Sequence, residues 1–347
     1  MKRMRSNKRV DVKGRRFYDT PKTAIVIHHT DLDGMGVRLI GGELARKRGL
    51  RPTFSACNYR NVNHIIRQQL AFFYGDIGAV IIGDISVDED TAQYLDRFCS
   101  DRHIELILVD HHKTAEWLNR YPWAEVHEEV DGVPRCATYQ LSKLDNPIFN
   151  KYKGLIQAID DWDTWKWEDR KRYTGKYLNS LFLMLGEDEF EEYILGRPNL
   201  DKMDDLISED MMRLIKIKTR EVEQNAKQLK KELWFTTLTY KGKTYKCGVC
   251  FLRTDISETS HYILTNTPEI DLLISWSPSR VNFRTIKNLD IKLGDLAKDF
   301  TGKGGGHPMS AGGLIDEMQT YRILNYMLNI SPRLKFSNLD HISQATF

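Results

Sequence analysis

Short, mostly apolar segments alternate with amphipathic ones along the first half of the chain. The short segments are rich in β-branched residues and shorter than ordinary buried helices, which is typical of strands covered on both faces. We expect strands at residues 23–28, 52–56, 79–82 and 104–109. Helical spacing marks residues 37–48, 62–73 and 91–98 between them. This alternation predicts a doubly wound, mostly parallel α/β sheet.

The pattern changes twice in the second half. Residues 204–233 contain apolar positions at helical spacing and no glycine or proline, which predicts one long helix. Before it we expect a short strand at 124–127 and helices at 114–119, 137–144, 149–160, 177–185 and 188–195. After it we expect a hairpin of residues 234–240 and 244–251, strands at 270–276 and 281–286, and helices at 256–264, 293–300 and 317–328.

These elements predict a catalytic α/β domain joined by the long helix to a smaller α/β domain. The expected divisions are a basic arm at residues 1–22, the first domain at 23–200, a helical connector at 201–233, the second domain at 234–330 and a tail at 331–347. A chain of 347 residues is long enough for two ordinary domains.

Composition narrows the class of protein. Hydrophobic residues make up 41% and charged residues 29% of the chain, and no apolar run reaches the length of a membrane span. The five scattered cysteines and the absence of an apolar leader predict a reduced, cytoplasmic protein. The first 22 residues are strongly basic, which favours a solvated tail over a phosphate-binding arm.

Acids and histidines follow three of the expected strands. The candidates are His28, His29, Asp31 and Asp33 after the first strand, Asp84 after the third, and Asp110, His111 and His112 after the fourth. Ligands of open α/β sheets bind at the carboxyl ends of the strands, so these side chains are expected to meet at one edge. Asp160, in a cluster with Asp161 and Asp163, is the expected further member.

This residue set is suited to divalent metals. Mixed carboxylates and imidazoles favour Mn²⁺, Fe²⁺ or Zn²⁺ over Mg²⁺. So many converging acids cannot all stay ionised without cations between them. Two metals sharing a bridging carboxylate would neutralise the site and could activate water against a phosphoryl centre.

The last third offers groups that suit phosphates. Residues 304–306 are three glycines followed by His307, and a flexible glycine loop lets backbone N–H groups approach an anion closely. Lys303 adds a donor, and Arg284 offers a fork that matches phosphate oxygens. A plain linker is the alternative interpretation of the glycines.

Two other motifs favour a structural interpretation. Cys247 and Cys250 lie three apart in an expected strand, so they point to opposite faces and a zinc site is disfavoured. Trp162, Trp165 and Trp167 could stack on nucleobases, but core packing is the favoured interpretation.

The motifs resemble the DHH phosphoesterase family in the branch with a DHH-associated C-terminal domain, which includes bacterial nanoRNases and RecJ-like exonucleases. The carrying residues are His29-Thr30-Asp31-Leu32-Asp33-Gly34, Gly83-Asp84, Asp110-His111-His112, Asp160, Phe283-Arg284-Thr285, and Gly304-Gly305-Gly306-His307 with Ala311-Gly312. Many relatives have the first histidine four residues before the first aspartate, where this chain has Ile27. His28 and His29 both stay open as the ligand, as do Asp160, Asp161 and Asp163.

The resemblance implies two Mn²⁺ ions, with Mg²⁺ as a substitute, in a cleft between the two domains. His29 and Asp31 would hold one metal, and Asp33, His111 and Asp160 the other, with Asp84 bridging them. His112 would lie beside the scissile phosphate and Asp110 would orient the imidazoles. Arg284, Gly304, Gly305, Gly306 and His307 would bind the substrate's phosphates or terminal nucleotide.

The sequence therefore predicts a Mn²⁺-dependent phosphodiesterase that releases 5′-mononucleotides from short single-stranded RNA or DNA, as a monomer or homodimer without membrane partners. The alternative is a hydrolase of small phosphorylated nucleotides, either cyclic or linear dinucleotides or 3′-phosphoadenosine 5′-phosphate. A non-catalytic nucleic-acid-binding protein is disfavoured, because acids beside a phosphate would only weaken its binding.

Overall fold

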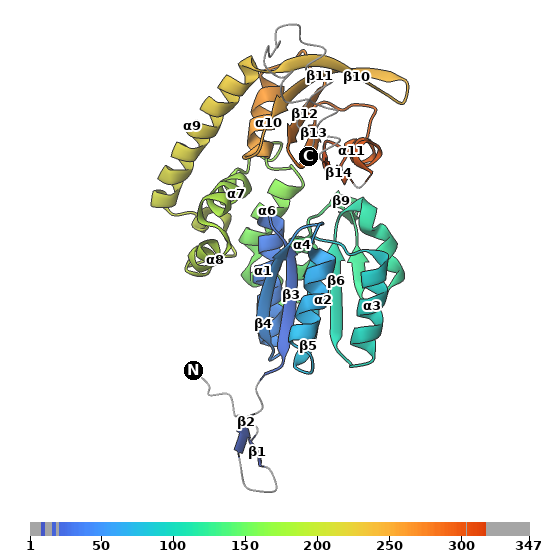
Figure 1. Cartoon of the computed structure of the whole chain (residues 1–347). Helices are drawn as coiled ribbons and strands as arrows, with labels where there is room; N and C mark the ends of the chain where they lie inside the picture. Colours follow the sequence, from blue (N-terminus) through green and yellow to red (C-terminus); the bar gives the residue numbers. More distant parts are fainter. Residues whose placement is uncertain (1–7, 11–15, 19–20, 303, 317–347) are drawn as a thin grey trace, which may run out of the picture. The chain divides into compact units, whose positions relative to one another are not determined.

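The chain divides into two units. The computed structural model describes residues 8–10, 16–18, 21–302 and 304–316 (Figure 1). The first unit is Met1–Lys218 and the second is Thr219–Phe347. The division between them falls within the 23-residue helix α9 (Glu209–Lys231). The predicted helix at 317–328 and the tail lie outside the described residues.

A five-stranded parallel sheet forms the centre of the first unit. Its order is β4-β3-β5-β6-β7, and every neighbouring pair is parallel. The strands are β3 (Thr23–His29), β4 (Arg51–Cys57), β5 (Ile77–Gly83), β6 (Glu105–Asp110) and β7 (Ala124–Val126). Since parallel neighbours begin at one edge and end at the other, the sheet has one carboxyl edge.

Helices cover both faces of this sheet. Val26 and Ile81 face a core shared with helix α1 (Leu32–Lys47), whereas Ile25 and Val80 face one shared with α2 (Val62–Phe72) and α3 (Glu89–Ser100). The remaining helices are η1 (Lys113–Arg120), α4 (Ala137–Ser142), α5 (Asn146–Lys151), α6 (Lys153–Asp163), α7 (Thr174–Leu185), α8 (Glu187–Leu195) and η2 (Met203–Asp205). The predicted doubly wound α/β class is confirmed.

Helix α1 begins five residues before its predicted start at residue 37. Asp31 caps it by accepting a hydrogen bond from the Gly34 backbone N–H at 3.0 Å. Gly34 and Gly36 suggested a loop, but they lie within α1 and allow its first turn to pack closely against neighbouring residues. A Cβ atom at Gly34 would lie 2.1 Å from the His29 carbonyl oxygen, so only glycine permits this approach.

Two small strand pairs were not predicted. Strands β1 (Lys8–Val10) and β2 (Arg16–Tyr18) pair antiparallel within the basic arm. Strands β8 (Glu129–Val130) and β9 (Val133–Pro134) form the second pair. Each strand has two or three residues, too few to show a periodic pattern in the sequence.

The second unit is built on a six-stranded mixed sheet of order β10-β11-β12-β13-β15-β14. The strands are β10 (Trp234–Tyr240), β11 (Lys243–Phe251), β12 (Leu272–Ser277), β13 (Arg280–Arg284), β14 (Gly305–His307) and β15 (Ser310–Leu314). The predicted hairpin at β10 and β11 is confirmed, and both residues of its turn, Lys241 and Gly242, have positive φ.

The two faces of this sheet have separate cores. One contains Leu293 and Leu296 of α11 (Leu293–Thr301), and the other contains Ile263 and Leu264 of α10 (Ile256–Thr265). Cys247 belongs to the first core and Cys250 to the second. The two thiols therefore point to opposite faces, as predicted, and do not form a pair.

The glycine-rich segment is not a loop. Gly305–His307 is strand β14, which pairs antiparallel with β15, itself absent from the prediction. Cβ atoms would lie 2.4 Å from the Ala297 carbonyl oxygen at Gly304, and 2.6 Å from the Ala311 Cα at Gly306, whose φ is 137°. These glycines let the segment pack closely, which the prediction of a flexible loop misses. Lys303 lies outside the described residues.

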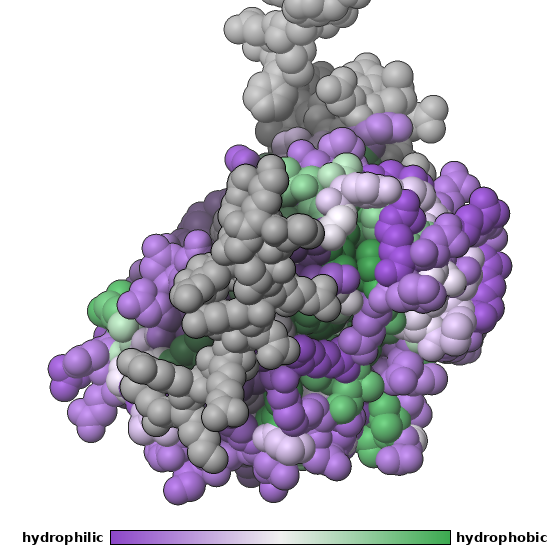
Figure 2. Space-filling view, turned by 90° about the horizontal axis from the view of Figure 1, so that it is seen from below, coloured by the Kyte–Doolittle hydropathy of each residue, from purple (hydrophilic) through white to green (hydrophobic). Residues whose placement is uncertain are grey.

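Apolar side chains are mostly inside the units. Figure 2 views the side at which β3 and β5 begin, and the described surface there is largely hydrophilic with separate apolar patches.

The five cysteines are free and buried. Among the described helices, none combines the length and apolarity needed to cross a bilayer.

Candidate metal centre

The candidate centre lies at the carboxyl edge of the first unit's sheet. The chain leaves β3 for β4 on one side and then returns to β5 on the other, so the strand order reverses between β3 and β5. Crevices at such a reversal are where open α/β sheets bind ligands. Asp31 follows β3, Asp84 follows β5 and Asp110 ends β6.

His29, Asp31 and Asp84 form the first group of donors. One ligand atom from each lies within 4.8 Å of the other two. Nδ1 of His29 is 2.7 Å from Oδ2 of Asp31 and 3.6 Å from Oδ2 of Asp84. Burial lowers the pKa of His29, but the charge of Asp31 has the opposite and larger effect, so the pKa rises to about 11. The ring thus behaves as a cation surrogate between two carboxylates.

Asp84 faces a second histidine with its other oxygen. Its Oδ1 lies 3.3 Å from Nε2 of His111. The backbone of Asp84 has a φ of 57°, a left-handed conformation that is rare for residues other than glycine. Burial, followed by the charges of Asp31 and Asp33, raises the pKa of Asp84 well above its usual range. Strain and charge crowding at one residue are typical of a functional position.

Asp33, His111 and Asp163 form the second group of donors, again within 4.8 Å of one another. Nε2 of His111 is 3.8 Å from Oδ2 of Asp33 and 3.5 Å from Oδ2 of Asp163. Burial raises the pKa of Asp163 to about 7, opposed by His111 and assisted by Asp33. Both groups therefore contain carboxylates whose ionisation depends on a nearby positive charge.

Asp33 is held rigidly by the helix it caps. Its two carboxylate oxygens accept hydrogen bonds from the backbone N–H groups of Ala137 and Thr138, at 2.8 and 2.9 Å. The Thr138 hydroxyl donates in turn to the Asp33 carbonyl at 2.8 Å. These contacts join the start of α4 to the start of α1 and fix the carboxylate that faces His111.

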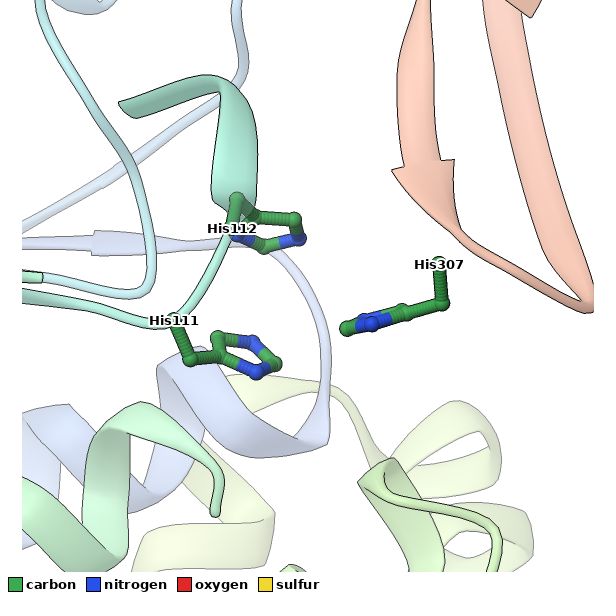
Figure 3. A group of neighbouring side chains, drawn as sticks. All are labelled: His111, His112 and His307. Atoms are coloured by element: carbon green, nitrogen blue, oxygen red, sulfur yellow. The ribbon is translucent and has the colours of Figure 1, made fainter. Parts of the chain in front are cut away.

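Asp110 orients the histidine pair. Its Oδ1 accepts hydrogen bonds from the His111 backbone N–H at 2.7 Å and from Nδ1 of His112 at 2.8 Å. Burial opposes ionisation of Asp110, but His112 keeps its pKa below the usual value. Figure 3 shows the His111 and His112 rings where β6 leads into η1, and their centroids are 4.5 Å apart.

The structure brings Asp163 rather than Asp160 into the cluster. Asp160 accepts hydrogen bonds from Arg135 at 2.7 Å and from the Cys136 backbone N–H at 3.0 Å. Asp161 is paired with Arg170 and Arg172. The three acids point in different directions from the end of α6, so Asp163, and not the expected Asp160, lies with Asp33 and His111.

His28 turns away from the cluster. The side chain is 1% exposed, and its Nδ1 lies 2.9 Å from the His29 carbonyl oxygen. Burial lowers the pKa of His28 to about 4. Successive residues of a strand point to opposite faces, so only one of the two histidines can face the acids. Of the pair left open by the sequence, His29 is the one beside Asp31.

The donor set fits divalent metal ions. Buried carboxylate oxygens of Asp84, Asp110 and Asp163 lack a hydrogen-bond donor among the described residues. Buried acceptors without donors are costly and need a cation or water. Carboxylates combined with imidazoles match Mn²⁺, Fe²⁺ or Zn²⁺. Asp84 of the first group lies 3.3 Å from His111 of the second, so the two groups adjoin and could hold two ions.

The second unit carries a polar row on its sheet. Arg284 of β13 is paired with Ser310 of β15, which is paired with His307 of β14. Directly opposed residues of antiparallel strands project from the same face. The three side chains thus form a partly buried row that can donate several hydrogen bonds.

Arg284 is the most constrained member of this row. One terminal nitrogen donates to the Ser257 hydroxyl at 2.9 Å, and Nε lacks an acceptor among the described residues. Burial lowers its pKa to about 10, which the charge of Glu258 opposes. A buried guanidinium with unused donors is suited to an anion.

The sequence is similar to that of a curated nuclease. Oligoribonuclease NrnB of Bacillus subtilis strain 168 is 27% identical over 293 residues, which cover 82% of this chain and 71% of the relative. The predicted resemblance to the DHH-family nanoRNases is confirmed. No family model matches the chain.

Solved structures align with most of this chain at lower sequence identity. An uncharacterized protein from Helicobacter pylori G27 is 20% identical, with a TM-score of 0.42, and the match covers 88% of this chain and 97% of that one. RecJ from Thermus thermophilus in complex with Mn²⁺ is 14% identical, with a TM-score of 0.48, and the match covers 89% of this chain and 52% of that one.

Sequence reasoning missed one aromatic residue at this centre. Tyr59 follows β4, and its ring centroid lies 5.9 Å from that of His29 and 6.3 Å from that of His112. The signal was available, because β4 was predicted and ends at the same edge as β3. The prediction considered only acids and histidines at the strand ends, and β4 is directly followed by neither. Trp162 and Trp167, in contrast, are 9% and 3% exposed and pack together, as the favoured interpretation held.

Proposed function

We propose that this protein is a Mn²⁺-dependent phosphodiesterase that hydrolyses short single-stranded oligonucleotides and releases 5′-mononucleotides. One observation carries the proposal: the two oxygens of Asp84 face two different histidines, each the centre of its own donor group. A carboxylate whose two oxygens face two adjoining donor groups suits a pair of metal ions. The similarity to an oligoribonuclease supports the proposal that the protein is a nuclease, and hence a metal-dependent phosphoesterase, rather than another kind of hydrolase.

The proposed ligand sets follow the two groups. His29 and Asp31 would hold one ion, Asp33, His111 and Asp163 the other, and Asp84 would contribute to both. Two bound ions would activate water and stabilise the attacking and leaving oxygens of a phosphoryl centre. The chain's own part is to keep these donors fixed and ionised.

His112 is the proposed group beside the scissile phosphate. An ionised carboxylate only accepts hydrogen bonds, so Asp110 holds a proton on Nδ1 of His112 and fixes the plane of the ring. The side chain is 20% exposed, in contrast to the 2% of His111. Such a ring can stabilise phosphoryl charge or protonate a leaving oxygen through Nε2.

The row of Arg284, Ser310 and His307 is proposed to bind the substrate's phosphate or its terminal nucleotide. Arg284 presents an unused Nε–H on a partly buried guanidinium. A forked donor matches two phosphate oxygens at once. Gly304, Gly305 and Gly306 are proposed to contribute backbone there, with β14 supplying a fixed edge rather than a flexible loop.

The deciding experiment is a product time course. End-labelled RNA and DNA oligomers of graded short lengths are incubated with Mn²⁺, Mg²⁺ or EDTA. The expected result is a Mn²⁺-dependent ladder of single-nucleotide steps that EDTA abolishes. Turnover of cyclic dinucleotides or 3′-phosphoadenosine 5′-phosphate without oligomer cleavage would assign the alternative substrates. If the protein binds oligomers but turns over none of these substrates, the proposal that it is a phosphodiesterase is rejected.

A further inference from the structure

Tyr59 lies at the exposed margin of the candidate metal centre. It sits in the loop between β4 and α2, two residues past Cys57, which is paired in register with His29. The loop is fixed by backbone donation from Asn58 to Oδ1 of Asn61 at 2.8 Å and from Arg60 to Oδ1 of Asn58 at 2.9 Å. A rigid turn thus presents the ring at the carboxyl edge of the sheet.

The ring is positioned between two functional histidines and is open to solvent. Its plane is tilted by 52° from that of His29 and is nearly perpendicular, at 88°, to that of His112. Tyr59 is 47% exposed. Exposure alone does not mark a ligand contact, because Phe72 and Tyr74 are more exposed. An exposed ring that flanks His29 and His112 is, in addition, placed where a ligand of the centre would lie.

We propose that Tyr59 stacks on the nucleobase that adjoins the scissile phosphate. The inference rests on the proposed function, which places that phosphate beside His112. A base lies only a few ångströms from its own phosphate, comparable to the 6.3 Å between the Tyr59 and His112 rings. The ring face would accept any base, because stacking depends on π-surface rather than on a hydrogen-bond pattern.

The tryptophans do not offer this contact. Trp162, Trp165 and Trp167 lie within 6.0 Å of one another as a cluster in the first unit's core. Tyr59 is the aromatic residue that, among the described ones, flanks both His29 and His112. Arg60, exposed and next in the loop, adds positive charge where the nucleotide backbone would pass.

The test compares Tyr59→Ala and Tyr59→Phe with the wild type on a 5′-phosphorylated dinucleotide and on two analogues of it. One analogue lacks the base of the first nucleotide, and the other lacks the base of the second. Stacking predicts a KM for the intact dinucleotide about tenfold higher in Tyr59→Ala, with kcat within about twofold. Tyr59→Phe should match the wild type because the ring is kept. With one of the two analogues, wild type and Tyr59→Ala should have the same KM.

Two controls separate stacking from other roles. Tyr74→Ala removes a tyrosine that is even more exposed, at 65%, and lies just before β5, at the opposite edge of the sheet; it should leave KM unchanged. The Mn²⁺-induced shift in melting temperature should be the same in Tyr59→Ala as in the wild type.

Three results would overturn the inference. They are an unchanged KM in Tyr59→Ala, equal losses in the alanine and phenylalanine variants, and a loss that persists with both analogues. Each of these would leave the proposed function standing. Absence of dinucleotide and oligomer cleavage by the wild type would instead refute the proposed function, and the inference with it.

Discussion

Oδ1 of Asp84 lies 3.3 Å from Nε2 of His111, which is 2% exposed and also faces Asp33 and Asp163. This contact connects the ends of β5 and β6 and brings together the two donor groups. Burial lowers the pKa of His111, but Asp163, Asp33 and Asp110 raise it above its usual value. Without metal, the imidazole thus supplies the positive charge that these acids need.

Replacing Asp84 should separate activity from stability. Asp84→Asn keeps the shape but removes the charge that serves both groups, so activity should fall by about 100-fold or more. The same change relieves carboxylate crowding, because burial and the charges of Asp31 and Asp33 already raise the pKa of Asp84. The melting temperature of the metal-free variant should equal or exceed that of the wild type. Full turnover by a folded variant would exclude Asp84 from the centre.

The end of α6 allows a matched comparison of two acids. Asp163→Asn should abolish metal-dependent turnover and leave the metal-free fold intact, since its Oδ2 lacks a hydrogen-bond donor among the described residues. Asp160→Asn should instead leave turnover in place and destabilise the fold by about 1–2 kcal/mol, because it weakens the charged hydrogen bond from Arg135. Urea unfolding and turnover are measured on both. The reverse pattern would restore Asp160 as the ligand.

Metal binding should raise stability. A ligand that binds only the folded state at 100 times its dissociation constant stabilises by about 2.7 kcal/mol. Calorimetric melting of protein treated with EDTA should therefore show a rise in melting temperature on adding Mn²⁺. In a double variant with Asp84→Asn and Asp163→Asn the rise should disappear. An equal rise in that variant would place the metal elsewhere.

Arg284 should contribute to affinity rather than to the chemical step. In Arg284→Lys the forked donor is lost and the hydrogen bond to Ser257 cannot be kept with the same geometry. We expect KM to rise by about tenfold, the equivalent of about 1.4 kcal/mol, with kcat little changed. Arg280→Lys, at the other end of β13, is the matched control. A large fall in kcat with unchanged KM would contradict this role.

Much of the fold could be predicted from local pattern. Short apolar runs and turn residues mark the strands of the first unit and the hairpin of β10 and β11, so period and length suffice to find them. The start of α1 was missed, because Gly34 resembles a loop residue until its 2.1 Å approach to the His29 carbonyl is known. Likewise, Gly304 and Gly306 suggest flexibility, although they pack closely around β14.

The sequence by itself determined that acids and histidines gather at one edge of the first unit's sheet, since the carboxyl ends of parallel strands share that edge. Only the tertiary structure decided which members meet. The sequence alone does not distinguish Asp160, Asp161 and Asp163. In the structure Arg135 pairs with Asp160, and Arg170 and Arg172 pair with Asp161. Asp163 is the one that faces His111. Those arginines lie 9 to 25 residues away from their partners along the chain and outside α6, so the pattern of α6 does not show which acid each arginine will contact. The edge at which Tyr59 lies followed from the predicted β4, but only the sheet order, with β4 beside β3, puts its ring next to His29.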